Sequence, residues 1–327
     1  MITVEEAEKI ILANAGDYGL EIVLFDKATG RVLAENIKAD RDMPPYNRVT
    51  MDGVAINYTA IEQGITTFTI KATQAAGDNP ASIGAPGECV EIMTGAALPE
   101  SADTIIRYED IEINDGKATL TTSGITKGQN IHVKGKDKNR GDILAVPGQV
   151  ITPAVISLLT SVGEAEVRVR KLPRVVVISS GDELVDVQAT PTPYQIRRSN
   201  SYTVQAVLKT QGVAADVLHI PDEPELMRQR IEHCLHYYDV ILLSGGVSAG
   251  KFDHLPKVLE ELQVEKLFHK VAQRPGKPFW FGRHNYGVTV FAFPGNPVSV
   301  FMCLHRYFLP WLQLSLGITT PAPIYAM

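Results

Sequence analysis

Four aspartates of this sequence stand close to glycines, an arrangement that suits chemistry on phosphate groups. They are Asp52, Asp137, Asp182 and Asp253. Carboxylates beside phosphates usually hold Mg²⁺, which keeps several of its waters and needs only one or two protein oxygens. Asp182 and Asp253 are the candidate Mg²⁺ ligands, although a single aspartate of this kind is more often a solvated turn residue or a helix cap.

Four loops rich in glycine and proline are suited to hold an anionic group. Three of them follow apolar runs and the fourth precedes a short one. They are 180–183 (SGDE), 244–250 (SGGVSAG), 294–297 (PGNP) and 274–278 (RPGKP). Glycines let backbone N–H groups approach phosphate oxygens, and Pro297 at the start of a helix would leave the next N–H groups free. Arg274 and Lys277 would neutralise the bound oxyanion.

Taken alone, each of these loops is more often a plain turn than a binding site. Four of them in one segment are hard to explain as turns only, so we predict a phosphate-type site. Ligands of open α/β sheets bind beyond the carboxyl ends of the strands. We therefore expect the first three loops to line one crevice together with 274–278.

The segments that must position these loops alternate between buried strands and amphipathic helices. Strands are expected at 174–179, 214–220, 239–243 and 288–293, and helices at 201–210, 222–235, 255–262 and 297–316. The second of these helices is expected to be capped by the stretch 222–225 (DEPE). This alternation indicates βαβ units and a mostly parallel sheet.

The first half of the chain has a different texture. A capping box at Thr3 and Glu6 predicts a helix over 4–14, and Thr152-Pro153 predicts another that ends at Gly163. Between 40 and 133, short strand-like runs are broken by Gly, Pro and Asn, which is typical of a small β-rich unit. We expect the two helices to belong together, with the β-rich unit inserted between them.

The composition excludes several classes of protein. The 327 residues, 45% hydrophobic and 21% charged, can bury proper cores over two or three domains. A net charge of −6 argues against binding along a nucleic-acid backbone. There is no signal-peptide pattern and no apolar stretch of about 18 residues, so we predict a cytoplasmic protein without a membrane span. Cys89, Cys234 and Cys303 are expected to be small buried hydrophobes in a reducing compartment.

Eight stretches resemble motifs of the MoeA family, the molybdopterin molybdenumtransferases, which includes the E domain of gephyrin. They occur in the family's order and, with the segments between them, cover nearly the whole chain. The stretches are 44–56 (PPYNRVTMDGVAI), 93–110 (MTGAALPESADTIIRYED), 135–144 (GKDKNRGDIL), 178–185 (ISSGDELV), 195–202 (QIRRSNSY), 242–253 (LLSGGVSAGKFD), 274–282 (RPGKPFWFG) and 293–300 (FPGNPVSV).

The resemblance implies a three-domain subunit. A discontinuous linking domain of 1–40 and 135–170 would carry an inserted β-rich domain over 41–134, and a molybdopterin-binding α/β domain would span 171–327. It also implies a homodimer in which each active site combines the α/β domain of one subunit with the β-rich domain of the other.

The resemblance also implies roles for particular residues. The implied catalytic residues are Asp52, Asp137, Asp182, Asp253 and Lys277. The implied substrate- and nucleotide-binding residues are Ser180, Gly181, Ser199, Asn200, Ser244, Gly245, Gly246, Ser248, Gly250, Arg274, Gly276, Pro278, Pro294, Gly295, Asn296 and Ser299.

Several features depart from the usual family pattern. The family commonly carries a small fourth β-domain after the last helix, and we expect that domain to be absent here. The stretch 47–50 (NRVT) replaces a commoner DNSA. Arg198 stands where an aspartate is frequent and Lys251 where an acid is frequent, and these two cations could partly substitute for the absent domain.

The function implied is the last step of molybdenum-cofactor assembly. Molybdate would enter an adenylylated molybdopterin, with cleavage of the phosphoanhydride and release of AMP. Mg²⁺ is the expected cofactor, Lys277 with nearby Ser299 is the candidate for molybdate, and a molybdopterin adenylyltransferase is an expected partner. Two alternatives stay open: a molybdopterin adenylyltransferase, which shares the α/β domain, and a catalytically impaired molybdopterin-binding scaffold.

Overall fold

The chain folds into two compact units in the computed structural model, which describes residues 1–247 and 254–318. Unit 1 contains residues 1–36 and 146–160 and the described residues from 164 onwards, and unit 2 contains 37–145 and 161–163. Unit 2 is therefore inserted in the sequence of unit 1. The finer division of unit 1 into a linking domain and an α/β domain stays a prediction.

Unit 1 is built around a six-stranded sheet in the order β16-β13-β17-β20-β19-β18. The bounds are β13 Val175–Ser180, β16 Ala215–Ile220, β17 Val240–Ser244, β18 Val264–His269, β19 Trp280–His284 and β20 Thr289–Phe293. The four strands β16, β13, β17 and β20 run parallel, and β19 is antiparallel to both of its neighbours. The predicted α/β fold with a mostly parallel sheet is confirmed.

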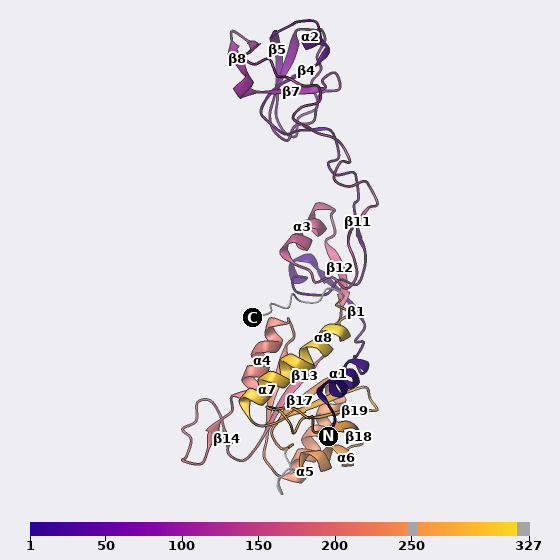
Figure 1. The fold of residues 1–327 in the computed structure, drawn as a ribbon, viewed down its shortest axis with the longest axis vertical. Helices are drawn as coiled ribbons and strands as arrows, with labels where there is room; N and C mark the ends of the chain where they lie inside the picture. Colours follow the sequence, from indigo (N-terminus) through magenta and orange to yellow (C-terminus); the bar gives the residue numbers. More distant parts are fainter. Residues whose placement is uncertain (248–253, 319–327) are drawn as a thin grey trace. The chain divides into compact units, whose positions relative to one another are not determined.

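Helices cover both faces of this sheet (Figure 1). One face packs on α1 (Val4–Ala13), α4 (Asn200–Thr210), α7 (Pro297–Cys303) and α8 (Leu309–Ser315), and the other packs on α5 (Pro224–Tyr237) and α6 (Leu255–Glu261). Side chains alternate along β13, so Val175 and Val177 join the first core whereas Val176 and Ile178 join the second. Burial on both faces explains why β13, β17 and β20 are continuous apolar runs.

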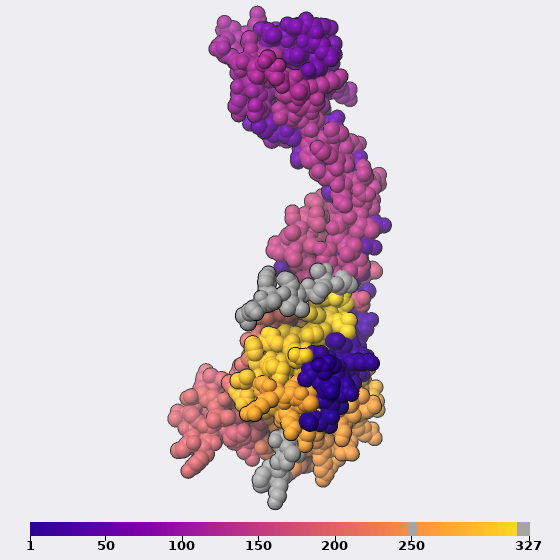
Figure 2. All heavy atoms as spheres, in the orientation of Figure 1, coloured from indigo at the N-terminus to yellow at the C-terminus, as the bar shows by residue number. Residues whose placement is uncertain are grey.

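The predicted helix over 297–316 contains an irregularity. A π-helical turn, Leu304–Phe308, separates α7 from α8. The indole Nε1 of Trp311 in α8 donates a 2.8 Å hydrogen bond to the carbonyl of Asn14, just after α1. Figure 2 shows the two segments, indigo and yellow, in contact. The capping box of Thr3 and Glu6 at the start of α1 is confirmed.

Unit 1 also contains two small two-stranded sheets and one further helix. One sheet is the parallel pair of β14 (Leu184–Val185) and β15 (Ile196–Arg197). β1 (Leu20–Leu24) pairs antiparallel with β12 (Glu166–Arg170), and α3 spans Pro153–Ser161. One face of the pair buries valines of β12. The other presents a row of aliphatic side chains from β1: Leu20, Ile22 and Leu24 are 49%, 61% and 52% exposed.

Unit 2 is rich in short strands, as predicted. Its six-stranded sheet has the order β7-β4-β6-β5-β9-β8, and among these pairs only β5 and β6 are parallel. The bounds are β4 Gly53–Ile56, β5 Thr67–Gln74, β6 Glu88–Ile92, β7 Thr104–Arg107, β8 Ile111–Asn114 and β9 Lys117–Leu120, with α2 at Thr59–Glu62. Two short pairs flank it: β2 (Ile37–Lys38) with β11 (Ile143–Ala145), and β3 (Arg48–Val49) with β10 (Ile131–His132).

Across the part of the chain that the structure describes, no helix combines the length and the apolar character needed to cross a membrane.

Candidate functional site

Three strand-end loops meet at the carboxyl edge of the sheet in unit 1. β13 ends at Ser180 and the adjacent parallel strand β17 ends at Ser244. The packing is so close that a Cβ on Gly245 would lie 2.7 Å from the carbonyl oxygen of Ser180, and one on Gly246 would lie 3.0 Å from its Oγ. Gly245 also donates to the carbonyl of Phe293, where β20 ends. Glycine is therefore required in the second loop because the strand ends approach one another closely.

A cavity of about 90 Å³ opens at this edge, within unit 1. Asn200, the first residue of α4, braces it: its Nδ2 donates to Ser244 Oγ at 2.9 Å and to the carbonyl of Gly295 at 2.8 Å. The cavity thus joins three predicted loops to the start of a helix. Its lining residues are Ser179, Ser180, Glu183, Leu184, Ile196, Arg197, Arg198, Ser199, Asn200, Ser201, Ser244, Gly245, Gly295 and Pro297.

Two serine hydroxyls in this lining are buried and unpaired among the described residues. They belong to Ser180 and Ser201, which are 6% and 0% exposed. Ser199, at the N-cap position of α4, makes no side-chain capping bond. Buried hydroxyls nearly always have partners, and the first N–H groups of a helix favour anions. The cavity wall is therefore equipped to bind an oxyanion.

Two aspartates lie together at the end of the neighbouring strands. The backbone N–H of Asp222, which follows β16, donates to Asp182 Oδ1 at 3.0 Å. Partial burial raises the pKa of the Asp222 carboxyl, and the negative charges of Asp182 and Glu183 raise it further. Such a concentration of carboxylate charge suits a divalent cation.

Asp222 was absent from the predicted site, although the rule that identified Asp182 applies to it equally. Both aspartates come two residues after the end of a parallel strand. The sequence pattern instead assigned Asp222, with the rest of 222–225, to a helix cap. The N-cap of α5 does lie in this stretch, at Glu223, although it forms no side-chain capping bond; the assignment is wrong for Asp222, which precedes the cap.

The loop at 274–278 contributes none of the described residues that line the cavity. It rests on α7, where a Cβ on Gly276 would lie 2.8 Å from Met302 and 2.9 Å from Cys303. Gln273 Nε2 donates to the carbonyl of Gly276 at 2.9 Å. Arg274 and Lys277 of this loop are exposed, and Pro278 is half-buried. Neither basic residue has an ion-pair partner within the described part of the chain.

The loop at 294–297 is used differently from the prediction. Asn296 caps α7, because its Oδ1 accepts hydrogen bonds from the N–H groups of Val298 at 3.0 Å and Ser299 at 3.2 Å. The expectation that Pro297 leaves these groups free is wrong, because the Asn296 side chain takes both. Ser299 is buried on α7 one turn before Cys303, which Gly276 approaches, and Pro294 is buried as well.

Asp52 and Asp137 belong to unit 2. Asp52 Oδ1 accepts a 2.6 Å hydrogen bond from the backbone N–H of Thr94, and this bond lowers the pKa of the carboxyl. The Oδ1 of Asp137 lies 2.9 Å from Nε2 of His132. Both side chains are exposed.

Three residues of the predicted site, Ser248, Gly250 and Asp253, lie outside the described residues, as does Lys251. Within the described ranges there is no group of three or more His, Cys, Asp or Glu side chains placed to hold a metal ion.

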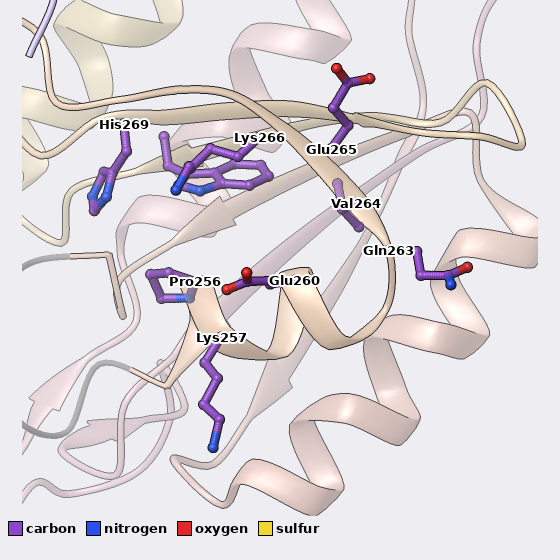
Figure 3. Close-up of a pocket in the computed structure, with 9 residues that line it drawn as sticks. Pro256, Lys257, Glu260, Gln263, Val264, Glu265, Lys266 and His269 are labelled. Carbon is purple, nitrogen blue, oxygen red and sulfur yellow. The ribbon is translucent and has the colours of Figure 1, made fainter.

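A second hollow, of about 390 Å³, lies between α6 and β18 (Figure 3). Its rim carries both positive lysines and negative glutamates. Figure 3 shows Lys257 and Glu265 pointing away from the hollow on opposite sides. None of the predicted site residues lines this hollow. The candidate site is therefore the cavity beside Ser180.

Known proteins resemble both halves of the chain. Residues 2–163 match the MoeA N-terminal region (domain I and II), and residues 176–314 match a probable molybdopterin binding domain. A molybdopterin molybdenumtransferase of Synechocystis sp. is 39% identical, over 100% of this chain and 82% of that protein. One of Staphylococcus aureus is 32% identical, over 97% of this chain and 76% of that protein.

A solved structure agrees with these matches. The molybdopterin biosynthesis MoeA protein of Pyrococcus horikoshii superimposes with a TM-score of 0.82 at 30% identity, covering 98% of this chain and 81% of that chain. Identity above 30% over nearly the full length, together with the shared fold, establishes the relationship. The chain belongs to the MoeA family of molybdopterin molybdenumtransferases.

Proposed function

We propose that this chain inserts molybdate into adenylylated molybdopterin, cleaving the phosphoanhydride and releasing AMP in molybdenum-cofactor biosynthesis. Its relatives of 39% and 32% identity carry the name molybdopterin molybdenumtransferase. The observation that carries the proposal is the cavity at the carboxyl edge, where two buried hydroxyls without partners lie beside the start of α4.

The hydroxyls of Ser180 and Ser201 would donate to oxygens of the substrate phosphates. The first N–H groups of α4 would add to this binding, because no side chain caps them. Asn200 would contribute by holding the Ser244 and Gly295 loops in place. Preorganised donors of this kind cost no rearrangement when negative charge develops.

Mg²⁺ fits the carboxylates found next to this cavity. Asp182 and Asp222 would hold it, with Asp253 as a further ligand predicted from the sequence. Hard carboxylate oxygens are the ligands that Mg²⁺ prefers, and two are sufficient because the ion keeps several waters. When bound, Mg²⁺ supplies positive charge that stabilises the bridging phosphates.

Lys277 and Ser299 are the proposed molybdate ligands. Molybdate is a tetrahedral dianion, and the ammonium group of Lys277 is exposed without an ion-pair partner in the described residues. Gln273 and the contact of Gly276 with α7 fix the backbone from which Lys277 extends. Removing one such preorganised donor typically costs ~10²–10³ in rate.

A homodimer would bring Asp52 and Asp137 of one subunit to the site of the other. The aliphatic row Leu20, Ile22 and Leu24 supports this assembly, since burying exposed apolar surface yields about 25 cal/mol per Å². Ile22→Asp should shift the protein to monomers by light scattering, whereas Leu314→Asp, at a 48% exposed leucine of α8, should leave the assembly unchanged. If the unaltered protein is monomeric at micromolar concentration, the shared site is refuted.

A cytoplasmic molybdopterin adenylyltransferase would supply the substrate, since it makes the phosphoanhydride that this chain cleaves. Direct contact between the two enzymes would pass the adenylylated pterin from one site to the next.

The decisive experiment measures AMP released from adenylylated molybdopterin in the presence of molybdate and Mg²⁺. Asp182→Asn and Lys277→Ala should each lower the rate by at least ~10²-fold, while Arg230→Gln, an exposed control on α5, should not change it. The double variant should lose much less than the product of the two single losses, because the residues act as one unit. If the unaltered protein binds the substrate and releases no AMP, it is a binding scaffold.

A further inference from the structure

Arg198 is a shielded cation in the wall of the candidate site. It lies two residues before the start of α4, its side chain is only 12% exposed, and it lines the cavity together with Ser180 and Ser201. A positive charge at this end of a helix is unfavourable, because the helix dipole is also positive there. A shielded cation in this position therefore requires anionic partners.

One such partner is present in the protein. Arg198 Nη2 donates to Asp186 Oδ2 at 2.7 Å, and Asp186 directly follows β14 (Leu184–Val185). The guanidinium carbon also lies 6.0 Å from the ring centre of Tyr202 on α4. Arginine has five N–H donors in a planar fork, so a single carboxylate at one nitrogen leaves donors for a second anion.

The rest of the cavity wall also includes donors without partners. The hydroxyls of Ser180 and Ser201 have no partner among the described residues, and the start of α4 carries no side-chain cap. Glu183 is the acid in this wall, and its carboxylate folds back over Gly181, where an added Cβ would lie 2.5 Å from Oε2. The wall facing Arg198 is thus suited to an anion.

We propose that Arg198 binds a phosphate oxygen of the substrate and thereby determines the affinity of this site for phosphorylated ligands. The inference rests on the proposed function for the identity of the substrate, an adenylylated pterin. Asp186 occupies one nitrogen of the guanidinium and leaves the other donors for the phosphate. The phosphate contact then lies between β15 (Ile196–Arg197) and α4, and it is separate from the loop at 274–278.

A purely structural role would predict a different pattern of losses. In that case Arg198 would only pin the segment after β14 to α4 through Asp186, and removing either partner would have the same effect. Asp186→Asn keeps the size of the side chain and removes its charge. It therefore separates the two roles, since it breaks the ion pair and leaves the cation in the cavity.

The experiment compares Arg198→Gln, Arg198→Lys and Asp186→Asn, with Arg230→Gln as the matched control. The KM and kcat of AMP release are measured for each, together with the Kd of AMP by calorimetry. Losing a charge-assisted hydrogen bond should raise KM by about tenfold to a hundredfold, with kcat changed much less. Arg198→Lys should recover part of the loss as a point charge, and Asp186→Asn should leave KM within about twofold.

An unchanged KM in Arg198→Gln, or an equal loss in Asp186→Asn, would overturn the inference. Tryptophan fluorescence shows whether each variant is folded, and Arg198→Lys carries the test if the glutamine variant is not. If the unaltered protein releases no AMP, the proposed function fails, and the Kd of AMP still tests Arg198. If the unaltered protein releases AMP and Arg198→Gln has the same KM and the same Kd for AMP, the inference about Arg198 fails while the proposed function stands.

Discussion

Replacing Gly53 by alanine tests whether the glycine after Asp52 serves the fold of unit 2. Gly53 begins β4, which lies between β6 and β7, and it pairs with Ile92 on one side and Arg107 on the other. A Cβ at this position would lie 1.9 Å from the carbonyl oxygen of Ile106 and 2.8 Å from its carbonyl carbon. These are backbone atoms of an adjacent strand, so no side-chain rotation relieves the clash.

The size of the effect follows from what must move. Strand β7 has to separate from β4, which strains the packing by about 1–3 kcal/mol and weakens ladder hydrogen bonds worth about 1 kcal/mol each. We expect Gly53→Ala to lower the free energy of unfolding of unit 2 by about 3–5 kcal/mol. Gly64→Ala is the matched control, because Gly64 has φ +82° and open space around it. It should cost only about 1–2 kcal/mol.

The two units can be followed separately. Both tryptophans of the chain, Trp280 and Trp311, belong to unit 1, so tryptophan fluorescence during denaturant unfolding reports on that unit. Hydrogen exchange of the β4 amides reports on unit 2. Gly53→Ala should accelerate this exchange far more than Gly64→Ala does and leave the fluorescence transition in place. Equal losses in the two variants would refute the clash as the reason for glycine.

Three further predictions concern hydrogen bonds and charge. The hydrogen bond from Thr94 lowers the pKa of Asp52 in the folded state. Its contribution to the stability of unit 2 is therefore present above the ordinary aspartate range and is lost as pH falls through the lowered pKa. Asp52→Asn should make the hydrogen exchange of the β4 amides depend less on pH in this acid range. Tyr307→Phe removes the hydroxyl that donates to Gln273 and should cost about 1–3 kcal/mol in fluorescence-detected unfolding. Burial and then the charges of Asp182 and Glu183 raise the pKa of Asp222. Glu183→Gln should lower that pKa, so acidification should weaken Mg²⁺ binding only at a lower pH than in the unaltered protein, as measured by calorimetry.

Burial on both faces made three of the strands easy to predict. β13, β17 and β20 are buried along their whole length, so they form continuous apolar runs that the sequence makes plain. β18 was missed, because only Val264 and Phe268 are buried and a register shift between Lys266 and Phe268 breaks the alternation. An edge strand with one irregularity carries too weak a pattern for recognition.

Hydrogen-bond competition limited the prediction of the site. Asn296 stands beside glycine and proline in a strand-end loop, but its side chain is occupied by the first turn of its own helix. Nothing in the sequence marks Ser201 as a site residue, because only its three-dimensional surroundings reveal that its hydroxyl has no partner among the described residues. Residue type and spacing therefore locate the loops, whereas the free donors have to be found in the structure.

The polarity of the candidate site reverses within two residues of one strand end. Ser180, at the end of β13, faces hydroxyl groups and the start of α4, whereas Asp182 lies against Asp222. Gly181 separates the two sides and is buried, with a φ of +141° that side chains other than glycine rarely adopt. Under the proposed function, phosphate oxygens on the donor side and a cation on the acid side require this abrupt change. The backbone geometry of Gly181 supplies it.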